Sequence, residues 1–234
     1  MRKTLCTALV CGTMLLSGCI QKTAPGFSEV KSAKERYESL DSAHITMTDL
    51  DTGLEMMEFS FYFNKDDEMI FSYCAVDGEK TEQAYSDGAQ FFYKTADEDG
   101  WRVIKSDDES YLYNLYTRTY RYPYARGSIF FLDGTSVSES NIAEAADGGK
   151  TITYVYDPDG LNSYAAGRLD NVSNFSALTA EYVLDAQGYI VSFTETGTVT
   201  DAEGQPSDVN IRITVDSMNE VYEIPYPVGE LILD

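Results

Sequence analysis

The side chains best suited to covalent or acid–base chemistry are scarce in this sequence. Its 234 residues include one histidine, His44, and four cysteines. A histidine paired with Cys74 could activate the thiol as a nucleophile. Cys74, however, stands in the apolar run FSYCAV, where a thiol is usually an inert part of the core. Sequence motifs of serine hydrolases, zinc proteases, phosphate loops and dithiol oxidoreductases are missing. We therefore expect no enzyme, no catalytic residue and no cofactor.

Acidic residues are abundant and gather in short stretches such as DEDGW and DPDGL. Carboxylates of this kind could bind calcium, but the stretches lack the spaced ligands and closing glutamate of an EF-hand loop. Paired carboxylates could also hydrolyse glycosides. Because these residues lie between alternating apolar runs, the pattern favours solvated hairpin tips. We predict no metal site.

The amino terminus indicates a modified cysteine. A basic start precedes an apolar stretch over residues 4–16, which is too short to span a bilayer. The sequence LSGC, ending at Cys19, resembles a bacterial lipobox. This resemblance implies that residues 1–18 are a signal peptide and that Cys19 is lipidated, with palmitate among its acyl chains. The alternative is an ordinary secretory signal with an incidental cysteine.

A lipidated cysteine would place the chain on the extracytoplasmic face of a cell membrane. Residues 19–27 then form the anchor and a short tether, and residues 28–234 form a single domain. Cys74 would be the only remaining thiol, so that domain has no internal disulfide and depends on its own core. The net charge of −22 offers no basic surface for nucleic acid. We expect the membrane to be contacted through the anchor.

The domain begins with a helical pattern and continues with strands. We predict a helix over residues 29–40, with Ser28 as its N-cap. One face of this helix carries Val30, Ala33, Tyr37 and Leu40. From Ile45 the apolar period changes to two. One face of EMMEFSFYF carries Met57, Phe59, Phe61 and Phe63.

Further alternating runs, such as EMIFSYCAV and AQFFYK, are separated by glycine- and acid-rich turns. These turns are typical of β-hairpins. After a second helix, predicted over residues 160–169, the runs LTAEYVL, YIVSFTETGTV and VNIRITV repeat the pattern. We expect Pro225 and Pro227 to close the sheet, where a missing N–H does little harm. The fold class is α+β, with an antiparallel sheet of roughly eight to eleven strands.

The order of lipobox, amphipathic helix, meander, helical insert and second meander resembles the LolA-like fold of lipoprotein carriers and LppX/LprG-type lipoproteins. The closest similarity lies in the run AEYVLDAQGYIVSFTETGTVTDAEGQ and the strand after it. The resemblance implies a curved half-barrel with helices packed on its concave face. In several of these families the space between sheet and helices holds acyl chains.

The stretch YLYNLYTRTYRYPY, residues 111–124, contains six tyrosines. A capping box at residues 106–109 predicts a helix that follows it. One broad face of this helix would carry Tyr111, Leu112, Leu115 and Tyr116, and its flank Tyr113, Tyr120, Tyr122 and Tyr124. Tyrosine is large, rigid and polar at one end. The stretch could therefore pack on the sheet, cover an apolar cavity, or stack against sugars.

Two functions agree with this pattern. We expect a non-enzymatic, membrane-anchored envelope lipoprotein that binds a lipid or other hydrophobic small molecule between sheet and helices. Its candidate ligand-binding residues are Met57, Phe59, Phe61, Phe63, Tyr111, Leu115 and Tyr116. The alternative is an envelope sensor or scaffold that binds a protein partner, with a filled core and no small ligand.

Overall fold

The computed structural model describes residues 23–105, 111–166, 174–200 and 205–232. Its helical elements are α1 (Phe27–Glu38), α2 (Tyr111–Tyr120), the π-helical turn η1 (Arg121–Ala125) and α3 (Pro158–Ala166). The strands before α2 are β1 (Ser42–Asp49), β2 (Glu55–Phe63), β3 (Met69–Asp77), β4 (Glu79–Ser86), β5 (Gln90–Thr95) and β6 (Trp101–Lys105). Those after it are β7 (Val137–Glu144), β8 (Lys150–Tyr156), β9 (Asn174–Leu184), β10 (Ile190–Thr200), β11 (Pro206–Asp216) and β12 (Leu231–Ile232).

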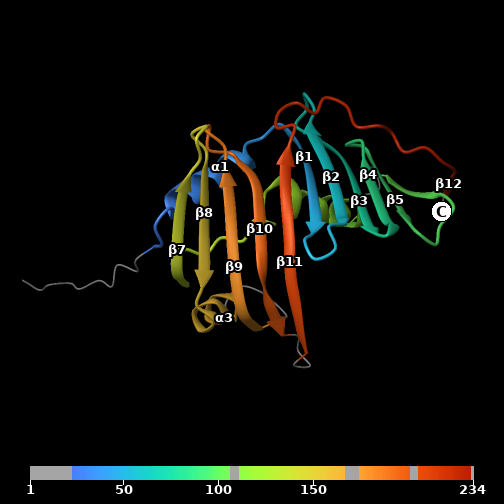
Figure 1. The fold of residues 1–234 in the computed structure, drawn as a ribbon. Helices are drawn as coiled ribbons and strands as arrows, with labels where there is room; N and C mark the ends of the chain where they lie inside the picture. The colour runs from blue at the N-terminus through green and yellow to red at the C-terminus, as the bar shows by residue number, and fades with distance from the viewer. Residues whose placement is uncertain (1–22, 106–110, 167–173, 201–204, 233–234) are drawn as a thin grey trace, which may run out of the picture.

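Within these residues the strands form one curved, unclosed sheet (Figure 1). Its order is β12-β6-β5-β4-β3-β2-β1-β11-β10-β9-β8-β7, so the two predicted meanders join where β1 pairs with β11. All pairings are antiparallel except that of β12 with β6. The antiparallel α+β prediction is confirmed in its main features. In the described part of the chain the sheet has twelve strands, one more than the upper end of the expected range, and the last of them, β12, has only two residues.

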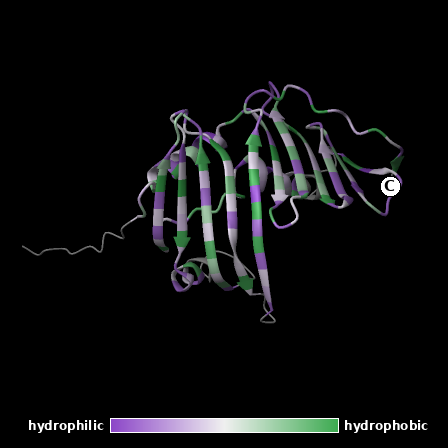
Figure 2. Cartoon of the chain, viewed as in Figure 1, coloured by the Kyte–Doolittle hydropathy of each residue, from purple (hydrophilic) through white to green (hydrophobic). Residues whose placement is uncertain are grey.

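Apolar and polar residues alternate along the strands, as the hydropathy colouring of Figure 2 shows. The inner face of the sheet is defined here by Phe59, Phe61 and Phe71, which are all fully buried. Helix α1 packs its buried residues Val30 and Tyr37 into the same core. A strand buried on one face and open on the other requires this period of two.

Helix α1 begins two residues earlier than predicted, and the N-cap prediction is wrong. The N-cap is Gly26, whose φ of 77° is a left-handed conformation that favours glycine. The carbonyl of Gly26 accepts hydrogen bonds from the N–H groups of Glu29 and Val30 (both 3.1 Å). Ser28 lies inside the helix, and its hydroxyl contacts the carboxylate of Glu29 (3.1 Å).

The prediction that Pro225 and Pro227 close the sheet is also wrong. Both lie in a segment between β11 and β12 that crosses to the far edge of the sheet (Figure 1). We call residues 217–232 the C-terminal strap. Ile224 of this strap packs on the outer face of the sheet. The buried outer-face residues beneath it are Ile70, Tyr85, Phe92 and Trp101.

The remaining helices fit their predictions less closely. Helix α3 starts at Pro158 and buries Leu161, whereas residues 167–169 of the predicted helix lie outside the described residues. The predicted capping box at residues 106–109 lies outside them too. None of the helices in the described ranges is long and apolar enough to cross a membrane.

Candidate functional site

The predicted ligand-binding row on β2 lies on the inner face of the sheet. Met57 is 4% exposed, Phe59 and Phe61 are fully buried, and Phe63 is partly buried. The row continues sideways into β3, because Phe59 pairs with Tyr73 and Phe61 with Phe71. Antiparallel pairing puts these side chains on one face, so they form a continuous aromatic surface.

Helix α2 and η1 cover the middle of this surface with two tyrosines. The ring of Tyr124 stacks on Phe59, with 4.7 Å between ring centres. The ring of Tyr120 contacts Tyr73 at 4.9 Å and Phe71 at 5.3 Å. Offset and tilted contacts at these distances are favourable packing arrangements for aromatic rings. The central part of the predicted cavity is therefore filled by side chains.

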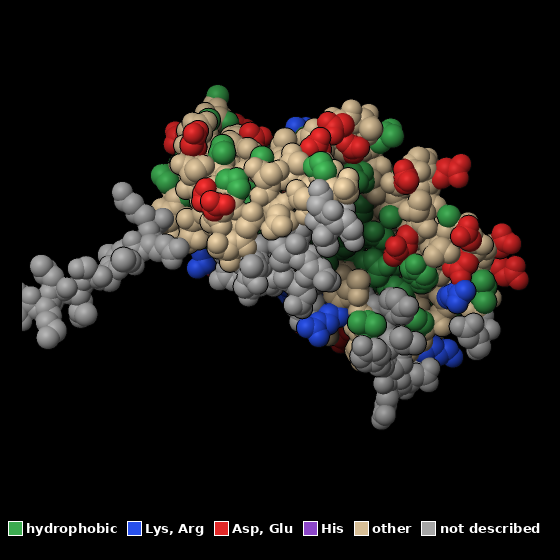
Figure 3. Space-filling view, turned by 90° about the horizontal axis from the view of Figure 1, so that it is seen from below, with side chains coloured by type: hydrophobic (Ala, Val, Ile, Leu, Met, Phe, Trp, Pro, Cys, Tyr) green, Lys and Arg blue, Asp and Glu red, His purple; other side chains and the backbone are tan. Residues whose placement is uncertain are grey.

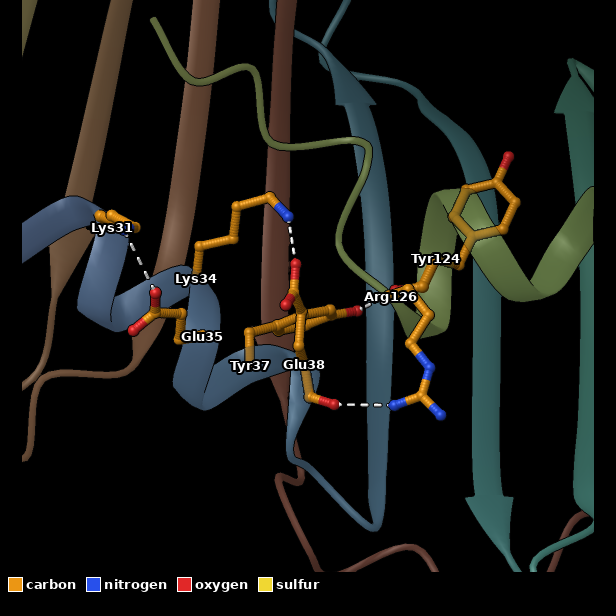
Figure 4. A network of polar contacts seen from close by, with 7 residues as sticks. All are labelled: Lys31, Lys34, Glu35, Tyr37, Glu38, Tyr124 and Arg126. Carbon is orange, nitrogen blue, oxygen red and sulfur yellow. Dashed lines mark hydrogen bonds and ion pairs between the residues drawn. The ribbon is translucent and has the colours of Figure 1, made fainter. Parts of the chain in front are cut away.

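The covering tyrosines have polar partners at their hydroxyl ends. The Tyr120 hydroxyl donates to the carboxylate of Glu82 (2.7 Å), and the Tyr37 hydroxyl donates to the carbonyl of Tyr124 (2.5 Å). Figure 4 shows the second contact joining α1 to η1. Burial raises the pKa of Tyr37, Tyr120 and Tyr124, so all three stay neutral hydroxyls at physiological pH.

The helix residues predicted to face the β2 row are Tyr111, Leu115 and Tyr116. Leu115 is 41% exposed. The side chains of Tyr111 and Tyr116 lie outside the described residues. Tyr120 and Tyr124, which we predicted for the flank, are the residues that face the sheet. Their spacing of four residues was the available signal, since positions i and i+4 share a helical face.

Apolar side chains beside the covered row are only partly buried. Those on the inner face include Met47, Tyr73, Tyr93 and Ile104. Figure 3, a view from below, shows hydrophobic side chains gathered in a hollow in the half of the molecule that holds β2 and β3. The inner face thus combines a packed centre with an apolar surface that remains open at one end.

Glu195 is a polar residue on the inner face that our sequence analysis missed. It lies on β10 between Ala180 of β9 and Ile211 of β11, on the same face as the buried Phe193. Burial raises the pKa of its carboxyl group to about 7. Alternation from Phe193 would have placed it there, because residues two apart in a strand share a face.

The two residues with catalytic potential do not form a nucleophile pair. His44 Nδ1 hydrogen-bonds with the Ser60 hydroxyl (2.8 Å), whereas the Cys74 thiol contacts the carbonyl of Ala75 (3.8 Å). Burial raises the pKa of Cys74, which keeps the thiol protonated and weakly nucleophilic. Among the described residues, no group of three or more His, Cys, Asp or Glu side chains is arranged to hold a metal ion.

Comparison with known proteins gives likenesses of fold. Neither a protein-family model nor a curated protein matches the sequence. The crystal structure of LprF from Mycobacterium bovis is similar over 88% of this chain and 99% of that chain, with 12% identity and a TM-score of 0.46. The complex structure of Pseudomonas aeruginosa MucA/MucB is similar over 82% of this chain and 56% of that chain, with 10% identity and a TM-score of 0.33. Neither shows what this chain binds.

Proposed function

We propose that this chain is a non-enzymatic lipoprotein of the bacterial envelope that binds a lipid or another hydrophobic molecule between its sheet and helices. Cys19 is the lipidated residue, and residues 28–234 are one domain on the extracytoplasmic face of the cell membrane. In this proposal the helices α1 and α2 cover the concave side of the curved sheet. In this proposal the packed row of Met57, Phe59 and Phe61 supports the floor, with the partly buried Phe63 at its end, and Tyr111, Leu115 and Tyr116 are ligand contacts on α2.

The observation that carries this proposal is the hydrophobic hollow of Figure 3. Together with the partly buried Met47 and Tyr73, it leaves apolar surface on the inner face in contact with water. Contiguous apolar surface of this kind typically marks a binding site. Covering it with an acyl chain would be favourable by roughly 25 cal/mol for each Å² removed from water.

A matched pair of substitutions tests the proposal. Met47→Glu puts a charge on the inner face, while Met56→Glu makes the same change on the adjacent strand at a position that is 40% exposed. We expect native mass spectrometry of protein purified from its own membrane to show a co-purifying hydrophobic molecule in the wild type and in Met56→Glu. Met47→Glu should lose most of it, because a buried carboxylate is strongly disfavoured beside an acyl chain.

Two outcomes would contradict the proposal. One is a wild-type protein that repeatedly shows only its own mass. The other is equal loading of the two variants after both are shown by circular dichroism to be folded. The first outcome would leave the protein-binding alternative as the better explanation.

Exposed residues of the C-terminal strap favour that alternative. Tyr222 is 79% exposed, Tyr226 is 50% exposed and Val228 is 95% exposed. Tyrosine is common at the centre of protein interfaces. If the chain is a sensor or scaffold, replacing Tyr222 and Val228 by serine should abolish cross-linking to an envelope protein and leave any lipid content unchanged.

A further inference from the structure

We propose that a pocket on α2 and η1 binds a phosphate group. This arginine pocket is lined by Asn114, Thr117, Arg118, Arg121 and Arg126, and its volume is about 490 Å³. The pocket adjoins the proposed ligand site at Phe63 but has its own polar lining, and the inference goes beyond the proposed function. Nothing in it depends on whether a lipid occupies the inner face.

The charge of the pocket is unusual for this chain. The protein has 39 acidic residues against 17 lysines and arginines, yet three arginines line one pocket. Among the described residues that line it, none carries a carboxylate. A pocket lined by positive charge attracts anions, even on a protein whose net charge is negative. The planar, forked guanidinium matches the oxygens of phosphate especially well.

The π-helical turn brings two of the arginines to one side. The N–H of Arg126 donates to the carbonyl of Arg121 (3.0 Å), which is the i→i+5 bond of a π-helix. In a regular α-helix, residues five apart would point about 140° away from each other. The wider turn therefore places both guanidinium groups beside the same ring, that of Phe63. Their central carbons lie 5.6 Å (Arg121) and 5.4 Å (Arg126) from the ring centre.

Contacts with neighbouring groups hold Arg121 and Arg126 in place before any ligand binds. Arg126 Nη1 donates to the main-chain carbonyl of Glu38 at the end of α1 (2.9 Å), as Figure 4 shows. Stacking on an aromatic ring and a fixed hydrogen bond both reduce the freedom that an arginine loses on binding. The remaining N–H groups of a guanidinium can still donate, because arginine carries five.

One polar atom of the pocket lacks a partner within the described residues. The hydroxyl oxygen of Thr117 is buried and makes no hydrogen bond there. An unsatisfied buried hydroxyl is costly and is often explained by an absent ligand or water. The arginines and Asn114, rather than this buried oxygen, are the groups that a phosphate would contact.

The test measures phosphate binding to the full-length, detergent-solubilised protein by calorimetry. The probes are inorganic phosphate, a short-chain phosphatidic acid and the matching uncharged diacylglycerol. The double variant Arg118→Gln, Arg121→Gln removes two positive charges from the pocket. Its control, Lys65→Gln, Arg212→Gln, removes two from exposed positions elsewhere. We expect the pocket variant to weaken binding of at least one phosphate probe about tenfold or more, and the control to match the wild type.

The probes also distinguish the source of the phosphate. Equal binding of inorganic phosphate and phosphatidic acid indicates a soluble phosphate compound, whereas binding of phosphatidic acid alone indicates a lipid headgroup. Both outcomes support the inference. It is overturned if the wild type binds no phosphate probe, or if the pocket and control variants bind equally. Binding of the uncharged diacylglycerol tests only the proposed function, so the two can fail separately. Should the double variant not fold, Arg118→Gln alone carries the same test, since Arg118 is exposed.

Discussion

Tyr120 joins helix α2 to the inner face of the sheet. Its side chain is 5% exposed and lies against Phe71, Tyr73 and Phe91. We expect Tyr120→Ala to lower the free energy of unfolding by roughly 3–5 kcal/mol, because it leaves a cavity and takes away the hydrogen-bond partner of Glu82. Chemical denaturation measures this loss. A change below about 1 kcal/mol would mean that this tyrosine closes a space that is already empty, and Tyr222→Ala, at a position 79% exposed, is the matched control.

A second residue, Glu195, makes the stability of the fold depend on pH. Its pKa is raised from 4.5 to about 7 by burial, so the folded protein holds this proton over a pH range in which the unfolded chain has released it. The stabilising effect of the protonated form is complete below pH 4.5 and is lost as the pH rises through about 7. We expect Glu195→Gln to be more stable than the wild type at pH 8, by up to about 3 kcal/mol, and equal to it near pH 4. If Glu195→Gln and the wild type differ in free energy of unfolding by the same amount at pH 4 and at pH 8, this assignment is contradicted.

The C-terminal strap is the element whose contribution to stability is easiest to measure by itself, because it can be removed by shortening the chain. It covers Trp101, the only tryptophan of the chain. The main-chain N–H of Trp101 donates to the main-chain carbonyl of Glu230 in the strap (2.7 Å). A chain that ends at Asn219 should expose Trp101, Phe92 and Ile70 to water. We expect a red shift of the tryptophan emission and a lower Tm, since a large apolar surface is uncovered. If the emission of the shortened chain is unchanged, the strap does not cover this face in solution.

The same elements show how far sequence alone can lead. The row Met57, Phe59, Phe61 and Phe63 and the buried face of α1 were predicted correctly, because burial on one side imposes a period that is visible in the residues. The position of the strap was not predicted, because its apolar residues follow neither a helical nor a strand period and so do not indicate which surface they cover. The burial of Tyr120 was not singled out, since six of the ten residues of α2 are tyrosine or leucine and the pattern favours no single direction. The arginine pocket depends on a π-helical turn, which has no reliable sequence signal.

At the scale of the whole molecule, the proposed lipid anchor on Cys19 would decide where all these surfaces operate. The body is strongly acidic, with a net charge of −22 for the chain, and an anionic bilayer surface repels such a body. In the proposed lipoprotein, stable attachment would depend on acyl chains on Cys19, each of which would contribute about 0.8 kcal/mol for every CH₂ group that enters the bilayer. We expect Cys19→Ala to move the protein from the membrane fraction to the soluble fraction of fractionated cells. Cys74→Ala, which changes the other cysteine of the mature chain, should leave the distribution as it is in the wild type. Membrane association that persists in Cys19→Ala and withstands high salt would instead assign the attachment to another part of the chain.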